Sequence, residues 1–366
     1  MGERQTIAGS VSSPTRRHHA DGLTDRRLAP HSMIMYDFPE LAVYATDRFV
    51  LVCMALFVEA VVGRAQWVFR ILPHPVAMFR ACAGFLDRRL NRSRRGPRAL
   101  VVRGAIVTAV LCIAGGLVGG SLEVWTATFP AGWVIDLAVV SLTVSQRGGY
   151  GDASRTVRAL TRDGVAAARE QVARYHKGRP SALDAHGVSR ALSEHLAAEF
   201  GRWLVAPVLW YLLLGLPALL IYVAIVAAAE RLGGDEAARA GFGWTAVRLE
   251  KFAGWIPGRI AGMLVVLACF LAPTARPIRA FRIMWSKAAA LPSASFGWPA
   301  AAFAGALSIE LGGANSAEGR PMPWFGDGTA RMTARDAHRA LLLFGYACVV
   351  HASILAVLAA VRVATV

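Results

Sequence analysis

The chain has 366 residues, of which 55% are hydrophobic, and it carries a formal net charge of +16 at pH 7. Its mean hydropathy is +0.44, and its apolar residues come in blocks instead of helical stripes, which excludes an ordinary soluble domain and indicates a bilayer protein. The charge does not indicate nucleic-acid binding, because no basic motif with interleaved aromatic residues accompanies it. Loops on the cytoplasmic side of a membrane collect Arg and Lys, and this explains the charge.

The first forty residues are polar and lack the apolar segment of a signal peptide. We expect residues 1–40 to be a disordered tail and residues 41–366 to form one membrane domain. The cysteines are scattered and include no C-x-x-C pair, so neither a zinc site nor a disulfide framework is predicted. No residue is assigned as a metal ligand.

Apolar blocks that could be membrane spans follow along the chain at 48–63, 101–120, 131–145, 203–229, 260–274 and 340–366. A spanning helix needs about 20 mostly apolar residues, so the second, fourth and sixth blocks are long enough. The other three are shorter and could tilt, re-enter or pack inside a bundle. The blocks predict an all-α fold, a polytopic integral membrane helical bundle.

Loop charge predicts the orientation of the bundle. Residues 64–100, 146–202 and 275–339 are basic, whereas the short connection around 121–130 carries one acid and no base. The positive-inside rule therefore places the three basic loops in the cytoplasm, and we expect a multi-pass protein of a bacterial inner membrane.

The segment 230–259 has two possible locations. If 203–229 crosses the membrane once, the segment lies outside, away from the other large loops. If Gly215 and Pro217 in "LLLGLPALL" break the block into a re-entrant hairpin, the segment stays inside. The sequence leaves both alternatives open.

A polar helical insertion occupies about 146–202. The spacing of Val157, Leu160, Val165 and Val172 predicts one helix over 152–178, and a second helix over 181–203 runs directly into the following apolar block. We expect the two to form a cytoplasmic helical hairpin. Its charged residues either face solvent or face a shared cavity.

The stretch "GWPAAAFAGALSIELGG" (297–313) combines a Gly-Trp-Pro corner, a run of small residues and a double glycine. We expect Gly297 and Pro299 to set a rigid corner and the small residues to let a helix approach its neighbours closely. Gly312 and Gly313 would end that helix and expose N–H groups that can meet phosphate oxygens. Tight packing with a glycine cap is the simpler interpretation.

Several short motifs follow one another between about residues 50 and 345. In chain order they are "HPV" (74–76), "AR" (168–169), "GRPSALD" (178–184), "SEHLAAEFGRWLVAP" (193–207), "FGWTAVRLEKFAGWIPGR" (242–259), the 297–313 stretch, "RPMPWFG" (320–326) and Asp336. In this order they resemble the CobD/CbiB family, the membrane-bound adenosylcobinamide-phosphate synthases of cobalamin biosynthesis. No single motif has the specificity of a metal-ligand motif. The resemblance depends on their common order.

The resemblance implies an ATP-dependent amide ligation of adenosylcobyric acid with an aminopropanol phosphate, with Mg²⁺ as a further cofactor, in a protein that can be a homo-oligomer. Glu194 and Glu250 are acids at matching positions and are the predicted catalytic residues. The predicted substrate-binding residues are His74, Arg169, Arg179, Arg248, Arg259, Gly297, Trp298, Gly312 and Gly313. Phosphates call for Arg side chains and backbone donors, so we expect Arg169, Arg179 and Arg259 to line one anion site.

The chain also departs from the family pattern, mostly by losing Asp and Asn. Arg202 and Lys251 stand where the family has Asp, and these reversals of charge would disrupt a magnesium site there. Glu199 and Glu230 are near enough in sequence to compensate. The alternative is therefore a non-catalytic or repurposed CobD/AmpE-like membrane protein that has lost the metal-binding carboxylates.

Overall fold

The computed structural model describes residues 47–63, 74–91, 96–234, 237, 240–319 and 321–365, all within one compact unit, Leu41–Val366. The predicted tail, 1–40, lies outside the described residues. The elements up to the middle of the chain are α2 (Arg48–Val62), α3 (Pro75–Leu90), α4 (Pro97–Thr126), α5 (Trp133–Thr143), α6 (Arg147–Arg162), α7 (Gly164–Val172), the 3₁₀ turn η2 (Pro180–Ala182), α8 (Ala185–Ala198), the π-helix η3 (Glu199–Val205) and α9 (Ala206–Leu232). They are followed by α11 (Trp244–Ala253), α12 (Trp255–Ala268), α13 (Pro277–Lys287), the 3₁₀ turn η4 (Ala288–Ala290), α14 (Ala294–Leu307), β1 (Glu310–Gly313), β2 (Met322–Gly326) and α15 (Ala334–Thr365).

The fold is that of an all-α membrane protein, as predicted. Three helical stretches in the described part are long and apolar enough to cross a membrane: Arg98–Thr126, Ala185–Leu232 and Ala334–Thr365. They cover the blocks 101–120 and 203–229 and residues 340–365 of the sixth block, the three that the sequence marks as long enough. The bent pair α11 and α12, with an angle of 50° between them, could supply a fourth. Strands β1 and β2 form a small antiparallel hairpin with a register shift between Leu311 and Gly313.

Helix α9 folds back on itself at Gly215. The backbone there has φ 75° and ψ −158°, which is not helical, and Pro217 follows. The bend brings together two residues that are far apart in the sequence, because Nη1 of Arg202 lies 3.4 Å from Oε1 of Glu230. A straight helix would separate these residues by about 42 Å, at 1.5 Å per residue. Tyr222 confirms the reversal, since its hydroxyl donates to the carbonyl of Arg202 at 3.0 Å.

The hairpin decides between the two alternatives for 230–259. The block 203–229 enters and returns, so its two ends lie on the same face of the bundle, and 230–259 begins beside Arg202. The re-entrant alternative is therefore the one that the structure adopts. The arm after the bend, Pro217–Leu232, is about 24 Å long as a helix, shorter than a hydrocarbon core of about 30 Å.

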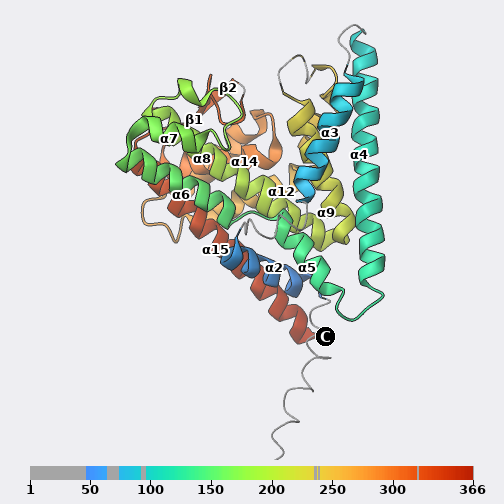
Figure 1. Cartoon of the computed structure of the whole chain (residues 1–366). Coiled ribbons are helices and arrows are strands. Elements are labelled where there is room, and N and C mark those ends of the chain that lie inside the picture. Colours follow the sequence, from blue (N-terminus) through green and yellow to red (C-terminus); the bar gives the residue numbers. More distant parts are fainter. Residues whose placement is uncertain are drawn as a thin grey trace, which may run out of the picture. The chain divides into compact units, whose positions relative to one another are not determined.

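Long helix α4 lies along the returning arm of α9 (Figure 1). Glycines make the approach possible, because a Cβ at Gly119 would lie 2.6 Å from Cα of Pro217 and one at Gly115 would lie 2.8 Å from the carbonyl oxygen of Leu220. Small residues at such contacts let helix backbones pack closely in a membrane. The bend at Gly215 is thus held against one end of α4.

The polar insertion differs from the prediction in one respect. The expected single helix over 152–178 is two helices, α6 and α7, which break at Asp163 and at Gly164 with φ 85° and pack against each other. Folding back lets Ala159 share a small core with Ala168 and Val172, which a continuous helix would place too far apart. The second helix is confirmed, since α8 continues through η3 into α9.

The 297–313 stretch also departs from the prediction. Ser293 caps α14 by accepting from the N–H of Phe296, so Gly297 and Pro299 lie inside the helix and do not form a corner. The helix ends at Leu307, and Gly312 and Gly313 lie in β1 instead of ending it. The predicted close packing is confirmed, because a Cβ at Gly297 would lie 2.9 Å from Cβ of Leu291.

Candidate functional site

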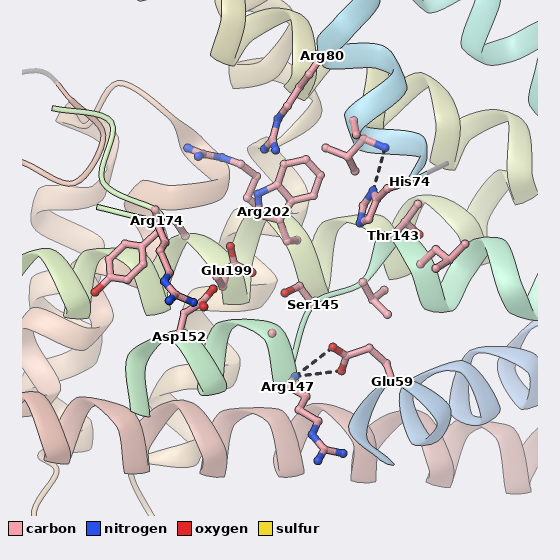
Figure 2. A pocket seen from close by; sticks show the side chains of 18 of the residues that line it. Glu59, His74, Arg80, Thr143, Ser145, Arg147, Asp152, Arg174, Glu199 and Arg202 are labelled. Atoms are coloured by element: carbon pink, nitrogen blue, oxygen red, sulfur yellow. Dashed lines mark hydrogen bonds between the residues drawn. The ribbon is translucent and has the colours of Figure 1, made fainter. Parts of the chain in front are cut away.

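A cavity of about 1810 Å³ opens between the polar insertion, the α9 hairpin and the short helices α2, α3 and α5. Its apolar wall comes mainly from α2, α3 and α5 and includes Val58, Val62, Val76, Val134, Leu137 and Leu142. Its charged wall includes Glu59, Arg80, Arg147, Asp152, Arg174, Lys177, Glu199, Arg202, Glu230 and Glu318. Most of these charged side chains are labelled in the close view of the cavity in Figure 2. Small-molecule pockets usually measure about 300–1,000 Å³, so this cavity can take a large or composite ligand.

Arg202 lies at the centre of a buried charge cluster on the cavity wall. It is 4% exposed and comes from η3. Its Nη1 donates to Oε1 of Glu318 at 3.0 Å, and its Nη2 donates to the hydroxyl of Ser293 at 3.4 Å. Burial by itself would raise the pKa of Glu318, but the charges of Arg202 and Lys177 more than offset that effect and hold it at about 2.

Two further cations complete this cluster around Glu230. Arg80, on α3, donates to Oε2 of Glu230 from Nη2 at 2.6 Å and from Nε at 3.0 Å. Lys177 donates from Nζ to Oε1 of Glu230 at 3.1 Å and lies 3.5 Å from Oε2 of Glu318. The guanidinium of Arg80 also lies over the ring of Trp203, 5.4 Å from its centroid. The cluster therefore joins α3, the loop after α7, both arms of the hairpin and the loop after β1.

A second charged group faces the cavity from α6 and η3. Glu199 packs against the amino-terminal turn of α6, where a Cβ at Gly149 would lie 3.0 Å from its side chain, and Asp152 follows one turn later. Nδ1 of His195 lies 3.9 Å from Oε1 of Glu199. The imidazole stacks on the ring of Tyr175 with 4.0 Å between centroids. Figure 2 shows Asp152 and Glu199 on the same side of the cavity.

Glu59 joins α2 to the start of α6. Its two carboxylate oxygens each accept from the backbone N–H of Arg147 at 3.1 Å, where the positive end of the α6 dipole lies. The side chain of Arg147 in turn donates to the carbonyls of Ala60 and Val61 at the end of α2. Two helices of the cavity wall are fixed to each other by this exchange.

The structure gives Glu194, a predicted catalytic residue, a positioning role. It is 1% exposed, and its carboxylate accepts from the N–H of Gly312 at 2.7 Å, the hydroxyl of Ser316 at 2.8 Å and the N–H of Ala317 at 2.7 Å. The carbonyl of Ala317 accepts from the N–H of Lys177 at 3.0 Å. Glu194 thereby holds the loop that carries Glu318 and supports Lys177. Its catalytic role stays a prediction.

Glu250, the other predicted catalytic residue, lies behind Arg202. Its Oε1 accepts from the hydroxyls of Ser293 at 2.7 Å and Ser295 at 2.6 Å, and it is 5% exposed. Ser293 bridges it to Arg202. Glu250 therefore adds a negative charge to the buried side of the cluster, and it does not line the cavity.

Among the predicted substrate-binding residues in the described part, His74 is the one that lines the cavity. It caps α3, and its Nδ1 accepts from the N–H of Val76 at 3.2 Å. Arg169 donates to the carbonyl of Leu183 at 2.6 Å and so ties α7 to the turn before α8, while Arg179 is exposed. These positions of Arg169 and Arg179 do not indicate an anion site shared with Arg259.

The remaining predicted residues lie in other packing environments. Arg259 lies over the rings of Trp255 and Trp298, at 3.9 Å and 4.2 Å from their centroids. Arg248 is exposed and lies 5.0 Å from the ring centroid of Trp244. The N–H of Gly312 meets the carboxylate of Glu194 in place of a phosphate, and a Cβ at Gly313 would touch the ring of Trp324. Substrate binding by this set stays a prediction that the cavity lining does not support.

Sequence reasoning missed most residues that line the cavity. Arg80, Asp152, Lys177 and Glu318 come from separate elements and belong to no motif, while His195 lies in the 193–207 motif but is not among the predicted site residues. A partial signal did exist in the departures from the family pattern, which single out Arg202, Glu199 and Glu230. The opposite charges of Arg202 and Glu230 become partners only once the α9 hairpin is known.

The donor set fits a metal that arrives with a nucleotide better than a resident one. Among residues 47–63, 74–91, 96–234, 237, 240–319 and 321–365 there is no group of three or more His, Cys, Asp or Glu placed to hold a metal ion. Mg²⁺ in nucleotide sites needs only one or two protein carboxylates, since phosphates and water complete its shell. Asp152, whose Oδ1 pairs with Arg155, and Glu199 are carboxylates of the cavity wall and are the candidates for this part.

Comparisons with known proteins agree with the motif order. The family described as CobD/Cbib protein matches residues 52–344. A cobalamin biosynthesis protein CobD of Sinorhizobium fredii is 32% identical over 318 residues, which cover 85% of this chain and 97% of that protein. The protein of the same name from Brucella suis is 32% identical over 81% of this chain and 92% of its own length, and one from Rhodobacter capsulatus is 28% identical over 80% and 92%. No solved structure matches the chain. By the extent of these matches, the chain is a member of the CobD/CbiB family.

Proposed function

We propose that the protein acts in cobalamin biosynthesis and catalyses the ATP-dependent ligation of adenosylcobyric acid with an aminopropanol phosphate, giving adenosylcobinamide phosphate. The observation that carries the proposal is the two-sided cavity. A corrinoid is large and amphipathic, and a cavity of 1810 Å³ with an apolar wall on α2 and α5 and a charged wall opposite suits it. The names and near full-length coverage of the relatives support the same pathway.

Charged groups of the cavity suit the other reactants. Arg80, Lys177 and Arg174 offer cationic donors to the phosphate of the amino alcohol and to the polyphosphate of a nucleotide. ATP with Mg²⁺ would supply the phosphoryl group that activates the corrinoid carboxylate. Asp152 and Glu199 would hold that Mg²⁺ from the α6 side.

Amide formation also requires the amine to lose a proton. His195 faces the cavity, and its Nδ1 lies 3.9 Å from Oε1 of Glu199. The stacking on Tyr175 fixes the plane of the ring. We assign His195 as the group that accepts this proton.

The positive-inside rule places the polar insertion and the cavity on the cytoplasmic face of a bacterial inner membrane. ATP and an amino-alcohol phosphate are both available there. The hairpin geometry of α9 supports this placement, because it brings 230–234 to the same face as Lys177.

Complementation tests the proposal. A cobalamin-producing host that lacks its family gene receives this gene, and growth that depends on cobalamin made from cobyric acid is measured. We expect rescue by the wild-type protein and by Glu170→Gln, which changes an exposed residue of α7 away from the cavity. With Glu199→Gln, we expect the rate of cobalamin synthesis that limits growth to fall at least tenfold. Absence of rescue, with the protein shown to be folded in the membrane, would favour the non-catalytic alternative suggested by Arg202 and Lys251.

A further inference from the structure

The carboxylate of Glu230 is surrounded by cations in an arrangement that also fits a phosphate. Arg80 approaches one oxygen with two N–H groups, and Lys177 approaches the other. Arg202 is more distant from this carboxylate, at 3.4 Å, and has a closer partner in Glu318 at 3.0 Å. Charge-assisted donors from a guanidinium and an ammonium are the groups that proteins use for phosphate oxygens.

Exposure divides the cluster into a fixed part and an accessible part. The side chains of Arg202 and Glu318 are 5% and 11% exposed, and they form a buried pair. The side chains of Arg80 and Lys177 are 49% and 38% exposed, and both line the cavity. A ligand in the cavity can therefore reach Arg80 and Lys177 without breaking the buried pair.

Glu230 is poorly placed to be a permanent partner for these cations. It lies two residues before Leu232, the last residue of α9, where the helix dipole disfavours a negative charge. Its side chain is 13% exposed, and it lines the cavity beside Arg80. Rotation of this one side chain would free the donors of Arg80 and Lys177.

We propose that Arg80 and Lys177 form the binding site for a phosphomonoester group in the cavity, and that Glu230 occupies this site until the ligand displaces it. The inference rests on the proposed function in one respect, since ligation requires a phosphate-bearing amine and a nucleotide. The phosphomonoester can come from either of them, and the chemistry recognised is the same.

The test measures binding without turnover. Purified full-length protein in detergent is titrated by isothermal calorimetry with inorganic phosphate, with phosphoethanolamine and with AMP, at constant ionic strength. Glu230→Gln removes the competing charge with little change of shape, and we expect it to tighten phosphate binding about five- to tenfold. Arg80→Gln and Lys177→Gln each remove a donor and should weaken binding about tenfold or more.

Asp87→Asn is the matched control. It removes an acid from α3 seven residues beyond Arg80, where the carboxylate accepts from the amide of Asn91 at 2.9 Å and lies 3.8 Å from Arg231. It therefore adds the same net charge without contacting Arg80, Lys177 or Glu230. We expect it to change phosphate affinity less than twofold. Thermal unfolding of every variant checks that each is folded.

The opposite signs of the effects decide the outcome. Weaker or unchanged binding by Glu230→Gln would overturn the inference, because the carboxylate would then organise the cations instead of competing with the ligand. An equal gain from Asp87→Asn would overturn it as well, since the effect would be one of general charge. A larger gain for phosphoethanolamine than for AMP would assign the site to the amine substrate, and the reverse would assign it to the nucleotide.

Failure of this inference is distinguishable from failure of the proposed function. If the wild-type gene does not rescue cobalamin-dependent growth but Glu230→Gln binds phosphate more tightly, the phosphate site stands and the ligation does not. If the wild-type gene rescues growth but Glu230→Gln binds phosphate no more tightly, the ligation stands and the phosphate site does not.

Discussion

Among single residues, Glu194 connects the interior of α8 to the geometry of the cavity. Its carboxylate accepts one hydrogen bond from Gly312 in β1 and two from the loop between β1 and β2, and that loop places Glu318 beside Arg202. A carboxylate in a hydrophobic core is costly unless its oxygens are satisfied, and here they are. The residue therefore contributes to function by holding other groups in place.

Replacing Glu194 should destabilise the protein substantially. Glu194→Ala leaves two buried N–H groups and one hydroxyl without an acceptor, and we expect a loss of about 3 kcal/mol or more. Glu194→Gln should recover only part of this, because the amide nitrogen cannot accept. Thermal unfolding in detergent measures the loss, with Glu170→Ala on the exposed side of α7 as control. Equal melting temperatures for the Glu194→Ala protein and its control would contradict the assignment.

The lowered pKa of Glu318 makes the stability of the protein depend on pH in the acid range. Its folded pKa of about 2 lies below the ordinary 4.5 of a glutamate, so its contribution is fully present above pH 4.5. That contribution is lost as the pH falls from about 4.5 to about 2, and it amounts to about 3 kcal/mol. The melting temperature of the wild type should therefore fall more steeply over this range than that of Glu318→Gln. Parallel curves would show that the pair with Arg202 does not hold the charge.

The residues of the cavity illustrate what sequence can and cannot show at this scale. His74 was predicted because it belongs to a motif at a helix start, and it lines the cavity. Arg80 and Lys177 belong to no motif, and their meeting at Glu230 depends on three separate elements. Arg259 was predicted as an anion ligand, but its neighbours are Trp255, one helical turn earlier in α12, and Trp298, whose approach no spacing rule reveals.

At the scale of elements, the break in α9 determines where the cavity lies. Hydropathy identified the block 203–229 but could not tell one crossing from a hairpin, because both bury the same apolar residues. Gly215 and Pro217 marked the possible bend, and the contact between Arg202 and Glu230 shows that it occurs. The sequence does not predict the break within 152–178, because Asp163 and Gly164 leave a gap of only about one helical turn between apolar residues.

Gly215 should tolerate no side chain. Its φ of 75° with ψ of −158° disfavours L-residues, and a Cβ would lie 2.5 Å from a carboxylate oxygen of Glu123. We expect Gly215→Ala to lower stability by about 2 kcal/mol or more, measured by thermal unfolding together with the yield of monodisperse protein on gel filtration.

Gly345→Ala is the matched control, because it lies in α15 with open space around the added Cβ and an ordinary helical backbone. It should be neutral or slightly stabilising. A neutral Gly215→Ala would mean that the chain passes straight through this position.

At the scale of the whole molecule, the hairpin predicts the sidedness of the loops. Lys177 pairs with Glu230, and so the loop after α7 and the end of α9 share one face. Within α4, Gly104 lies beside Phe242 near that face, and Gly119 lies beside Pro217 at the bend of α9. The connection after α4 therefore lies on the opposite face.

Accessibility of single cysteines measures this sidedness. In a background without the native cysteines, Glu170→Cys and Gly234→Cys should react with a membrane-impermeant maleimide only after the cytoplasmic face is opened. Thr128→Cys should react in intact cells. Reaction of Gly234→Cys in intact cells would show that α9 crosses the membrane once.

The most direct test of the account is a reaction with purified protein. The full chain in lipid nanodiscs is incubated with adenosylcobyric acid, an aminopropanol phosphate, ATP and Mg²⁺, and the products are identified by mass spectrometry. We predict adenosylcobinamide phosphate in an amount that falls at least tenfold with Glu199→Gln and is unchanged with Glu170→Gln. Absence of this product from folded wild-type protein, or its formation at equal rates by the Glu199→Gln protein, would contradict the assignment of the cavity as the ligation site.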